Sequence, residues 1–255
     1  MTRFGWLSRP GPVPIAHRGG ALENEENTLE AFAHAVALGY RHLETDVHLS
    51  ADGVVVIHHD DTLERLTGDP RAIASMPWAE LQQVRTHGGA VIPRLADLLE
   101  EHPGVMVNIE AKSDAVVDPL ADLLKRMNAL PRIGTGNFDG SRMARLRQRL
   151  GGDLCWSPAY GGALGLWLSG WGLPLPRAPY PMVQVPPRYR GIPVVTPRFM
   201  RAAHRRGVQV QVWTVDDAAE MHALLDMGVD GLMTDRPTLL KEVLVQRGQW
   251  RGGDA

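Results

Sequence analysis

Acidic side chains recur at alternate positions in two short segments of the chain. Glu44 and Asp46 lie two residues apart, and Glu110 stands two residues before Lys112. Side chains two apart on a β-strand share a face, so three carboxylates at neighbouring strand ends repel one another unless a cation lies between them. One such acid alone would be better explained as an exposed or ion-paired residue. The set of three predicts one divalent cation, Mg²⁺ or Ca²⁺, at Glu44, Asp46 and Glu110, because oxygen ligands favour hard ions.

Two histidines stand where they can meet these acids. His17 closes the first apolar run, and His59 closes a run that follows the turn signal Asp52-Gly53. A hairpin at that turn pairs residues whose numbers sum to about 105, which sets His59 roughly opposite Asp46. Both histidines titrate near neutral pH, so the pair predicts a general acid and a general base, in an order that stays open.

Two basic side chains flank the candidate catalytic groups. Arg18 follows His17 directly, and Lys112 shares a strand face with Glu110. A guanidinium fork suits a phosphate, and an ammonium group supplies a compact positive charge. A divalent ion together with both is more positive charge than a sugar isomerase needs, so the set favours chemistry at an anionic phosphoryl centre.

Short apolar runs alternate with helical patterns through almost the whole chain, as in βα units that build a parallel sheet. Eight runs are expected as strands: Val13–His17, His42–Asp46, Val105–Glu110, Ile133–Phe138, Asp153–Ser157, Met182–Val185, Val208–Trp213 and Val229–Thr234. Six segments are expected as helices: Thr28–Leu38, Val116–Met127, Gly140–Leu150, Arg198–Arg206, Asp217–Met227 and Thr238–Gln246. The count and length fit a single (β/α)₈ TIM-barrel domain over residues 1–255, with the site at the carboxyl ends of the strands. No Gly-rich phosphate turn follows the first strand to favour a doubly wound sheet.

Two regions interrupt this rhythm. Thr62–Pro93 is long for a connection and is expected to form an insertion over the barrel mouth, with a short helix near Pro77–Val84. Tyr160–Pro181 is rich in Gly, Pro, Leu and Trp and is expected to be a surface excursion. Its segment Ala163–Leu175 is too short and too broken to span a bilayer. It is either a helix buried against the barrel or an exposed lip that makes weak lipid contact through Trp167 and Trp171.

Composition limits the class of protein. The chain of 255 residues is 44% hydrophobic and 22% charged, as in globular proteins, and its formal net charge is −2. No basic block or tail stands out, so we expect no nucleic-acid partner. Cys155 is the only cysteine, which excludes an internal disulfide and a cysteine-built metal site. Without a secretory signal pattern or a run of about 20 apolar residues, the expected location is the cytoplasm.

Taken together, short motifs in this order resemble those of the glycerophosphodiester phosphodiesterase family. They are His17-Arg18-Gly19, Glu26-Asn27-Thr28, Glu44-x-Asp46, Asp52-Gly53, His59-Asp60-x-x-Leu63-x-Arg65-x-Thr67, Glu110-x-Lys112, Trp213-Thr214-Val215 and Gly228-Val229-Asp230-Gly231 with Thr234-Asp235-x-Pro237. Each motif is weak alone, but the set spans residues 13 to 237 and is highly specific. The family usually has proline where Glu25 stands, a departure that touches no proposed ligand.

The resemblance implies a TIM barrel with an insertion after the His-Asp motif and the same metal ligands and histidines named above. Arg18 and Lys112 would bind the phosphate, and a substrate hydroxyl would attack phosphorus to give a cyclic phosphate that water opens. Asn27 would orient the metal-bound oxygens, although capping of the helix at Thr28 explains it nearly as well. Trp213 would stack on the glycerol or serve as a core aromatic.

Three functions remain to be weighed. The first is hydrolysis of small glycerophosphodiesters to sn-glycerol 3-phosphate and an alcohol, in lipid and glycerol phosphate metabolism. The second is a lysophospholipase D that acts on single-chain phospholipids. The third, a catalytically inactive barrel used as a binding module, is the least favoured because no proposed catalytic residue is missing. The headgroup, the physiological metal and the oligomeric state stay open.

Overall fold

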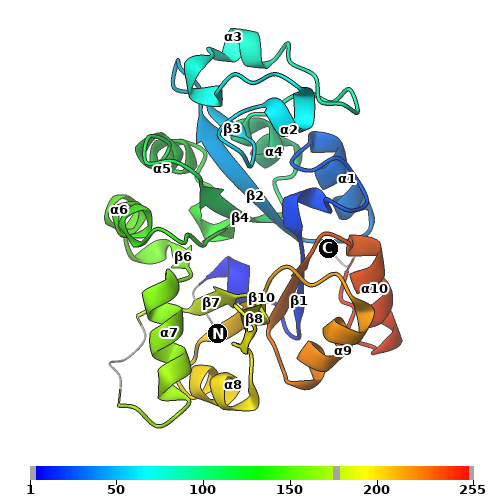
Figure 1. The fold of residues 1–255 in the computed structure, drawn as a ribbon, viewed down its shortest axis with the longest axis vertical. Helices are drawn as coiled ribbons and strands as arrows, with labels where there is room; N and C mark the ends of the chain where they lie inside the picture. The colour runs from blue at the N-terminus through cyan, green and yellow to red at the C-terminus, as the bar shows by residue number, and fades with distance from the viewer. Residues whose placement is uncertain (1–3, 175–178, 253–255) are drawn as a thin grey trace.

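Eight parallel strands form a nearly closed barrel with helices around it (Figure 1). The computed structural model describes residues 4–174 and 179–252. The strands run in the order β6-β5-β4-β2-β1-β11-β10-β7. Their bounds are β1 Val13–Ala16, β2 His42–Leu49, β4 Met106–Ala111, β5 Ile133–Thr135, β6 Cys155–Trp156, β7 Met182–Val185, β10 Gln209–Val212 and β11 Gly231–Thr234. Between β6 and β7, the ends of the order, the backbone N–H of Gln184 donates to Ser157 Oγ at 2.8 Å. The (β/α)₈ architecture expected from the sequence is confirmed.

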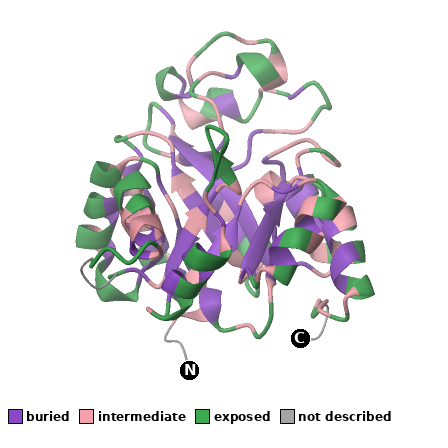
Figure 2. Cartoon of the chain, turned by 60° about the horizontal axis from the view of Figure 1, so that its bottom comes forward, coloured by how far each residue is buried: buried purple, intermediate pink, exposed green. Residues whose placement is uncertain are grey.

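The outer helices begin where their sequences provide a cap. The six expected helices are α1 Leu29–Ala37, α5 Val117–Arg126, α6 Gly140–Leu150, α8 Pro197–His204, α9 Ala218–Asp226 and α10 Pro237–Gln246. Thr28 Oγ1 accepts from the backbone N–H of Ala31 at the start of α1, and Asp217 caps α9 in the same way. Figure 2 shows the strands buried inside a layer of helices whose outer faces are exposed.

Helix α4, Leu95–Glu101, was not expected and follows the insertion directly. Helix α7, Tyr160–Ser169, occupies the segment expected to be a surface excursion, where a buried helix was one of two alternatives. Leu166 is buried, while Leu164 remains exposed, so α7 is neither wholly buried nor wholly a lip. Of the stretch Ala163–Leu175, Leu175 lies outside the described residues.

The hairpin register differs from the expected one by one residue. Strand β3, Val55–Ile57, returns antiparallel to β2 and pairs Val47 with Ile57, so paired residues sum to 104 rather than 105. His58, not His59, therefore stands opposite Asp46, and its backbone N–H donates to Asp46 O at 3.1 Å. The turn is one residue longer than assumed, since Ser50 donates its backbone N–H to Val54 O at 2.9 Å and leaves residues 51–53 in the loop. His59 follows β3 as a loop residue.

The amino-terminal end of the barrel is closed by the 3₁₀ turn Gly5–Leu7. Trp6 is fully buried there, and its indole Nε1 donates to Gln211 Oε1 at 3.4 Å. His42 Nε2 lies 3.0 Å from the carbonyl oxygen of Trp6. Burial lowers the pKa of His42 to about 4, so the imidazole is neutral at neutral pH. The opposite end, at the carboxyl ends of the strands, stays open.

The insertion after β3 has an apolar cluster of its own. It contains the short helices α2, Glu64–Thr67, and α3, Trp78–Leu81, which Figure 1 shows gathered beyond β3. The buried members of the cluster are Val56, Leu63, Ile73, Met76, Leu81 and Ile92. The expected helix near Pro77–Val84 corresponds to α3. None of the helices in the described part of the chain is long and apolar enough to cross a membrane.

Candidate active site

The pairing of β2 with β4 brings the three acids together. These parallel strands set Glu44 beside Asn108 and Asp46 beside Glu110. Glu44 is 4% exposed and Asp46 is 1% exposed. Alternation along both strands directs these side chains to the same face, as the sequence indicated.

Burial and crowding perturb this cluster. Burial, and then the charge of Asp46, raise the pKa of Glu44 to about 8. Burial also raises the pKa of Glu110, although Lys112 opposes the shift. Negative charge is therefore costly here unless positive charge is nearby.

The donor set of Glu44, Asp46 and Glu110 fits a hard divalent ion, because it consists of carboxylate oxygens that need a cation to remain charged. Within residues 4–174 and 179–252, no three His, Cys, Asp or Glu side chains form a ready-made metal cage. Lys112 Nζ instead lies 3.4 Å from Asp46 Oδ1 and 3.4 Å from Glu110 Oε2. Metal binding at these residues would compete with that ammonium group.

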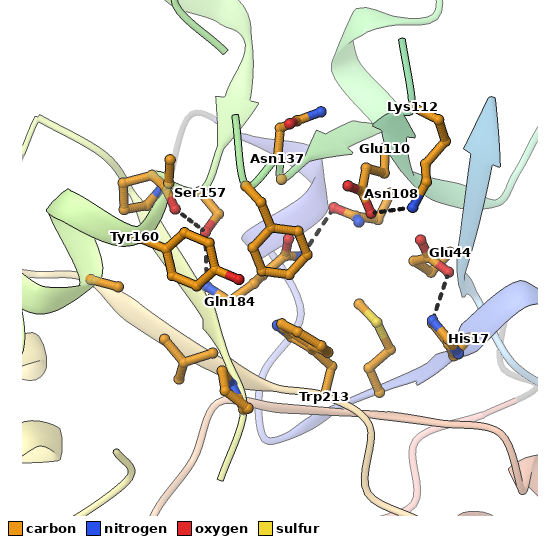
Figure 3. Close-up of a pocket in the computed structure, with 18 of the residues that line it drawn as sticks. His17, Glu44, Asn108, Glu110, Lys112, Asn137, Ser157, Tyr160, Gln184 and Trp213 are labelled. Atoms are coloured by element: carbon orange, nitrogen blue, oxygen red, sulfur yellow. Dashed lines mark hydrogen bonds and ion pairs between the residues drawn. The ribbon is translucent and has the colours of Figure 1, made fainter. Parts of the chain in front are cut away.

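His17 sits between two carboxylates. Its Nδ1 lies 2.6 Å from Asp235 Oδ1, and its Nε2 lies 3.6 Å from Glu44 Oε2 (Figure 3). Burial acts to lower the pKa of His17, but Glu44 and Asp235 outweigh it, so the pKa is raised. Asp235 thus fixes the ring so that Nε2 faces the pocket.

His59 lines the same pocket and is held by a carboxylate in the same way. Its Nδ1 lies 2.6 Å from Asp60 Oδ1. Burial opposes the shift, but hydrogen bonds from Arg65 and His59 lower the pKa of Asp60 to about 2. Asp60 therefore stays charged and orients the imidazole, so that both proposed catalytic histidines have a carboxylate on Nδ1.

Arg18 adopts a left-handed backbone conformation, with φ of 49°, immediately after β1. Its Nη1 donates to Glu26 Oε1 at 3.1 Å. Its Nε lies 3.1 Å from Asp46 Oδ2 at an angle that makes no hydrogen bond, which leaves this buried nitrogen unsatisfied. A polar ligand oxygen at the pocket could satisfy it.

Asn27 links the acid cluster to helix α1. Its Nδ2 donates to Asp46 Oδ2 at 3.2 Å, and its Oδ1 accepts from Thr45 Oγ1 at 2.8 Å. The helix cap is provided by Thr28. Of the two roles considered for Asn27, the contacts match orientation of Asp46.

A row of aromatic rings lines the other half of the pocket, which has a volume of about 200 Å³. Trp213 and Tyr160 flank the opening opposite the acids in Figure 3. Phe138 lies between them, with ring centroids 5.3 Å from Trp213 and 5.0 Å from Tyr160. Tyr189 lies outside the pocket lining, with its ring 5.8 Å from that of Tyr160. Trp213 thus lies at the pocket and not in the closed core.

The pocket floor is polar. Gln184 Nε2 donates to both Asn108 Oδ1 and Gln211 Oε1 at 3.0 Å. This bridge fixes the amide orientations below the acids and below the aromatic row. The pocket therefore has one charged wall, one apolar wall and an ordered floor.

The sequence analysis named the proposed catalytic and ligand-binding side chains but missed the side chains that orient them. Asp60 and Asp235 belong to the family motifs, Asp60 directly after His59 and Asp235 directly after β11. Alternation on β4 had already set Asn108 on the face of Glu110. Phe138 was expected at the end of a strand but lies in the connection after β5, and Tyr160 begins α7, so neither position indicated a pocket residue.

Comparison with known proteins gives consistent matches along the chain. A model described as the glycerophosphoryl diester phosphodiesterase family matches residues 17–239. The chain is 38% identical to "Probable glycerophosphodiester phosphodiesterase 2" of Mycobacterium tuberculosis, over 97% of this chain and 96% of that protein. It is 28% identical to "Lysophospholipase D GDPD1" of Homo sapiens, over 90% of this chain and 85% of that protein. A putative glycerophosphoryl diester phosphodiesterase from Silicibacter pomeroyi has a TM-score of 0.79 and 25% identity, with 96% of this chain and 98% of that chain covered.

Proposed function

The chain belongs to the glycerophosphoryl diester phosphodiesterase family, and we propose that it hydrolyses small glycerophosphodiesters to sn-glycerol 3-phosphate and an alcohol. The observation that carries this proposal is that two carboxylate-anchored histidines, His17 and His59, line one pocket beside the three acids. A binding module does not need two oriented histidines. An enzyme that cleaves a phosphodiester needs them as a general acid and a general base.

Enzymes of this family generally depend on a divalent metal. We assign Glu44, Asp46 and Glu110 as the residues that would hold the ion, Mg²⁺ or Ca²⁺. When bound, such an ion neutralises charge on the phosphoryl oxygens and lowers the barrier to displacement at phosphorus. Asn27 would keep Asp46 oriented, as its hydrogen bond at 3.2 Å does here.

The histidines carry the proton transfers in this proposal. With Nδ1 held by Asp235 or Asp60, each imidazole presents Nε2 for the reaction. One takes the proton of the attacking hydroxyl, and the other gives a proton to the departing alkoxide. The raised pKa of His17 favours its protonated form and suits the role of acid.

Arg18 and Lys112 would bind the phosphate oxygens. Both line the pocket next to the acids, and the unsatisfied Nε of Arg18 is a donor in want of an acceptor. Trp213 would cover the glycerol moiety, because its ring lines the same pocket as His17 (Figure 3). The substrate is then clamped between a charged wall and an apolar one.

Turnover of glycerophosphocholine, followed by release of glycerol 3-phosphate with added Mg²⁺ or Ca²⁺, tests this function. Comparable kcat/KM is expected for glycerophosphoethanolamine, since the proposed ligands gather around phosphorus. A preference above about 100-fold, roughly 2.7 kcal/mol, would contradict specificity centred on the glycerol phosphate. No turnover of either substrate with either ion would overturn the function itself.

A second candidate is lysophospholipase D activity on single-chain phospholipids, and the aromatic row favours it. Phe138 packs its face on Tyr160 at an interplanar angle of 30°, so the rings form a track and not a cage around a point. A track suits an acyl chain better than a choline cation, which needs several ring faces around one centre. Lysophosphatidylcholine is the substrate to compare. A Phe138→Ala change should lower its kcat/KM more than that of glycerophosphocholine if the row binds the chain.

A further inference from the structure

Large apolar side chains are exposed on helix α7, in the turn that follows it, and on the hairpin of β8, Arg188–Tyr189, and β9, Ile192–Pro193. We call five of them the apolar lip. They are Tyr160, Leu164, Trp171, Tyr189 and Ile192, with exposed fractions of 54%, 56%, 59%, 44% and 58%. Such a grouping on a protein surface commonly marks a binding site.

Contacts between the helix and the hairpin make the lip one surface. The rings of Tyr160 and Tyr189 lie 5.8 Å apart. Trp167 Nε1 donates to the carbonyl oxygen of Pro193 at 3.3 Å, and the Trp167 ring lies 5.7 Å from that of Trp171. The lip is therefore held at both ends by contacts that cross from α7 to neighbouring elements.

The charge of this region differs from that of the rest of the chain. Residues 154–215 contain seven arginines and no Asp, Glu or Lys. Because the whole chain has a formal net charge of −2, the residues outside this segment carry −9. Positive charge is thus concentrated in the sequence segment that contains the lip, in an otherwise acidic chain.

Three of these arginines border the lip without a carboxylate partner. Arg188, Arg190 and Arg198 are exposed, and none forms an ion pair with any residue in the described ranges. Arg190 lies over the ring of Tyr189 at 5.5 Å, and Arg198 over that of Trp171 at 4.4 Å. In contrast, Arg142 and Arg145 on α6 are paired with aspartates.

The lip is also continuous with the active-site pocket. Tyr160 belongs to both, since it lines the pocket and stacks on Phe138 at 5.0 Å. A molecule lying on the lip can therefore reach the pocket along the aromatic row. This continuity separates the lip from the scattered exposed apolar residues elsewhere, such as Val245 on α10.

We propose that the apolar lip and its arginines dock the protein on an anionic lipid surface, with the pocket opening toward that surface. Aromatic and aliphatic side chains enter the interface, while unpaired guanidinium groups beside them meet the lipid phosphates. Exposed Leu164 and Ile192 favour lipid over nucleic acid, which offers no apolar layer for them. The arginines favour it over a second copy of this lip, because like charges would then face each other.

Co-sedimentation with lipid vesicles tests the docking directly and needs no turnover. Wild-type protein should bind vesicles containing about 30% phosphatidylglycerol and should bind pure phosphatidylcholine far more weakly. Arg188→Gln/Arg190→Gln should weaken binding to the anionic vesicles about 30-fold, the equivalent of about 1 kcal/mol for each arginine. Binding should also fall when salt is raised to about 0.5 M.

Matched variants separate a specific surface from a general loss of charge or apolarity. Lys125→Gln/Arg126→Gln removes two exposed charges at the end of α5, and Val245→Ser removes an exposed apolar residue on α10. Both should bind anionic vesicles as wild type does. Tyr189→Ser/Ile192→Ser should weaken binding about tenfold or more. All of these variants should retain turnover of glycerophosphocholine, since none of the altered residues lines the pocket.

Failure of wild-type protein to bind the anionic vesicles would overturn the proposal, and so would an equal loss in the α5 control. A wild-type dimer that Tyr189→Ser/Ile192→Ser dissociates, without vesicle binding, would assign the lip to contact between copies and overturn it as well. Vesicle binding by protein that shows no turnover would leave the docking intact and count against the proposed function only.

Discussion

The guanidinium of Arg65 donates to both carboxylate oxygens of Glu26, at 2.9 Å and 2.7 Å. Its Nε also donates to Asp60 Oδ2 at 2.5 Å. Asp60 orients His59, and Glu26 accepts from Arg18. One side chain from the insertion therefore connects the proposed acid–base histidine with the proposed phosphate-binding arginine.

Replacing Arg65 should impair catalysis without unfolding the protein. Arg65→Gln removes the support of both Asp60 and Glu26, and misplacement of catalytic groups by about 1 Å costs on the order of 10²-fold in kcat/KM. Arg65→Lys should recover only part of the loss, because an ammonium cannot form the two-pronged contact with Glu26. Steady-state kinetics and the melting temperature are the measurements.

Arg71→Gln is the matched control for this experiment. Arg71 lies in the same insertion and pairs with Asp69 and Glu80 instead of site residues. Added guanidinium should restore part of the activity of Arg65→Gln, since the Arg65 side chain is 45% exposed and its place is accessible. Equal kinetics for the Arg65 and Arg71 variants would show that the connection has no catalytic role.

Removal of divalent metal should abolish turnover, and Mg²⁺ or Ca²⁺ should restore it. Glu44→Gln, Asp46→Asn and Glu110→Gln should each raise the metal concentration needed for half-maximal activity, because each removes a charged oxygen donor. Asp118→Asn, which affects only the exposed pair with Arg145, serves as the control. Full activity after exhaustive EDTA treatment would refute the metal assignment.

His17→Ala and His59→Ala should each lower kcat by about 10²–10⁴, the usual contribution of a positioned acid or base. The double variant should lose less than the product of the two effects, since both groups act in one reaction. His204→Ala, at an exposed pair with Asp230, controls for the loss of an imidazole. A folded single variant with near wild-type kcat would remove that histidine from the mechanism.

Glu25 should fasten the insertion to the barrel. It accepts from Thr86 Oγ1 at 2.5 Å and from the backbone N–H of Gly88 at 2.8 Å. Glu25→Ala should therefore speed limited proteolysis within residues 62–93, while the melting temperature changes little. Glu30→Ala, on the exposed face of α1, should leave the cleavage rate unchanged. Equal cleavage of both variants would mean that these hydrogen bonds do not hold the insertion.

Local periodicity was sufficient to predict the site residues that lie on regular strands. The pairing of β2 with β4 sets Asp46 beside Glu110, as alternation and the βα pattern indicated. The predicted pairing of His59 with Asp46 was wrong by one residue. Strand register depends on the length of the turn, and the Asp-Gly signal does not specify that length. Helix α7 was expected only as one of two alternatives, because its glycines lower helix propensity, and packing against its neighbours overrides that preference.

Contacts between distant segments carry no such signal. The Arg65 side chain meets Glu26 only because the insertion returns over the loop after β1, and neither segment encodes that path in its own pattern. Glu25 illustrates the same point, since it looked like a neutral departure from the family sequence. Its two partners lie 61 and 63 residues further along the chain.

The separate apolar cluster of the insertion has a consequence for how the pocket opens. Leu63, Ile73 and Leu81 bury one another and not the barrel helices, so this segment forms a cooperative unit of its own. Amide hydrogens there should exchange with solvent through sub-global opening, at a lower free energy than those of the barrel strands. The segment that carries Arg65, which lines a neighbouring hollow with His59, can then open while the acid cluster keeps its geometry. Admission of substrate and stability of the fold are in this way governed by two different equilibria.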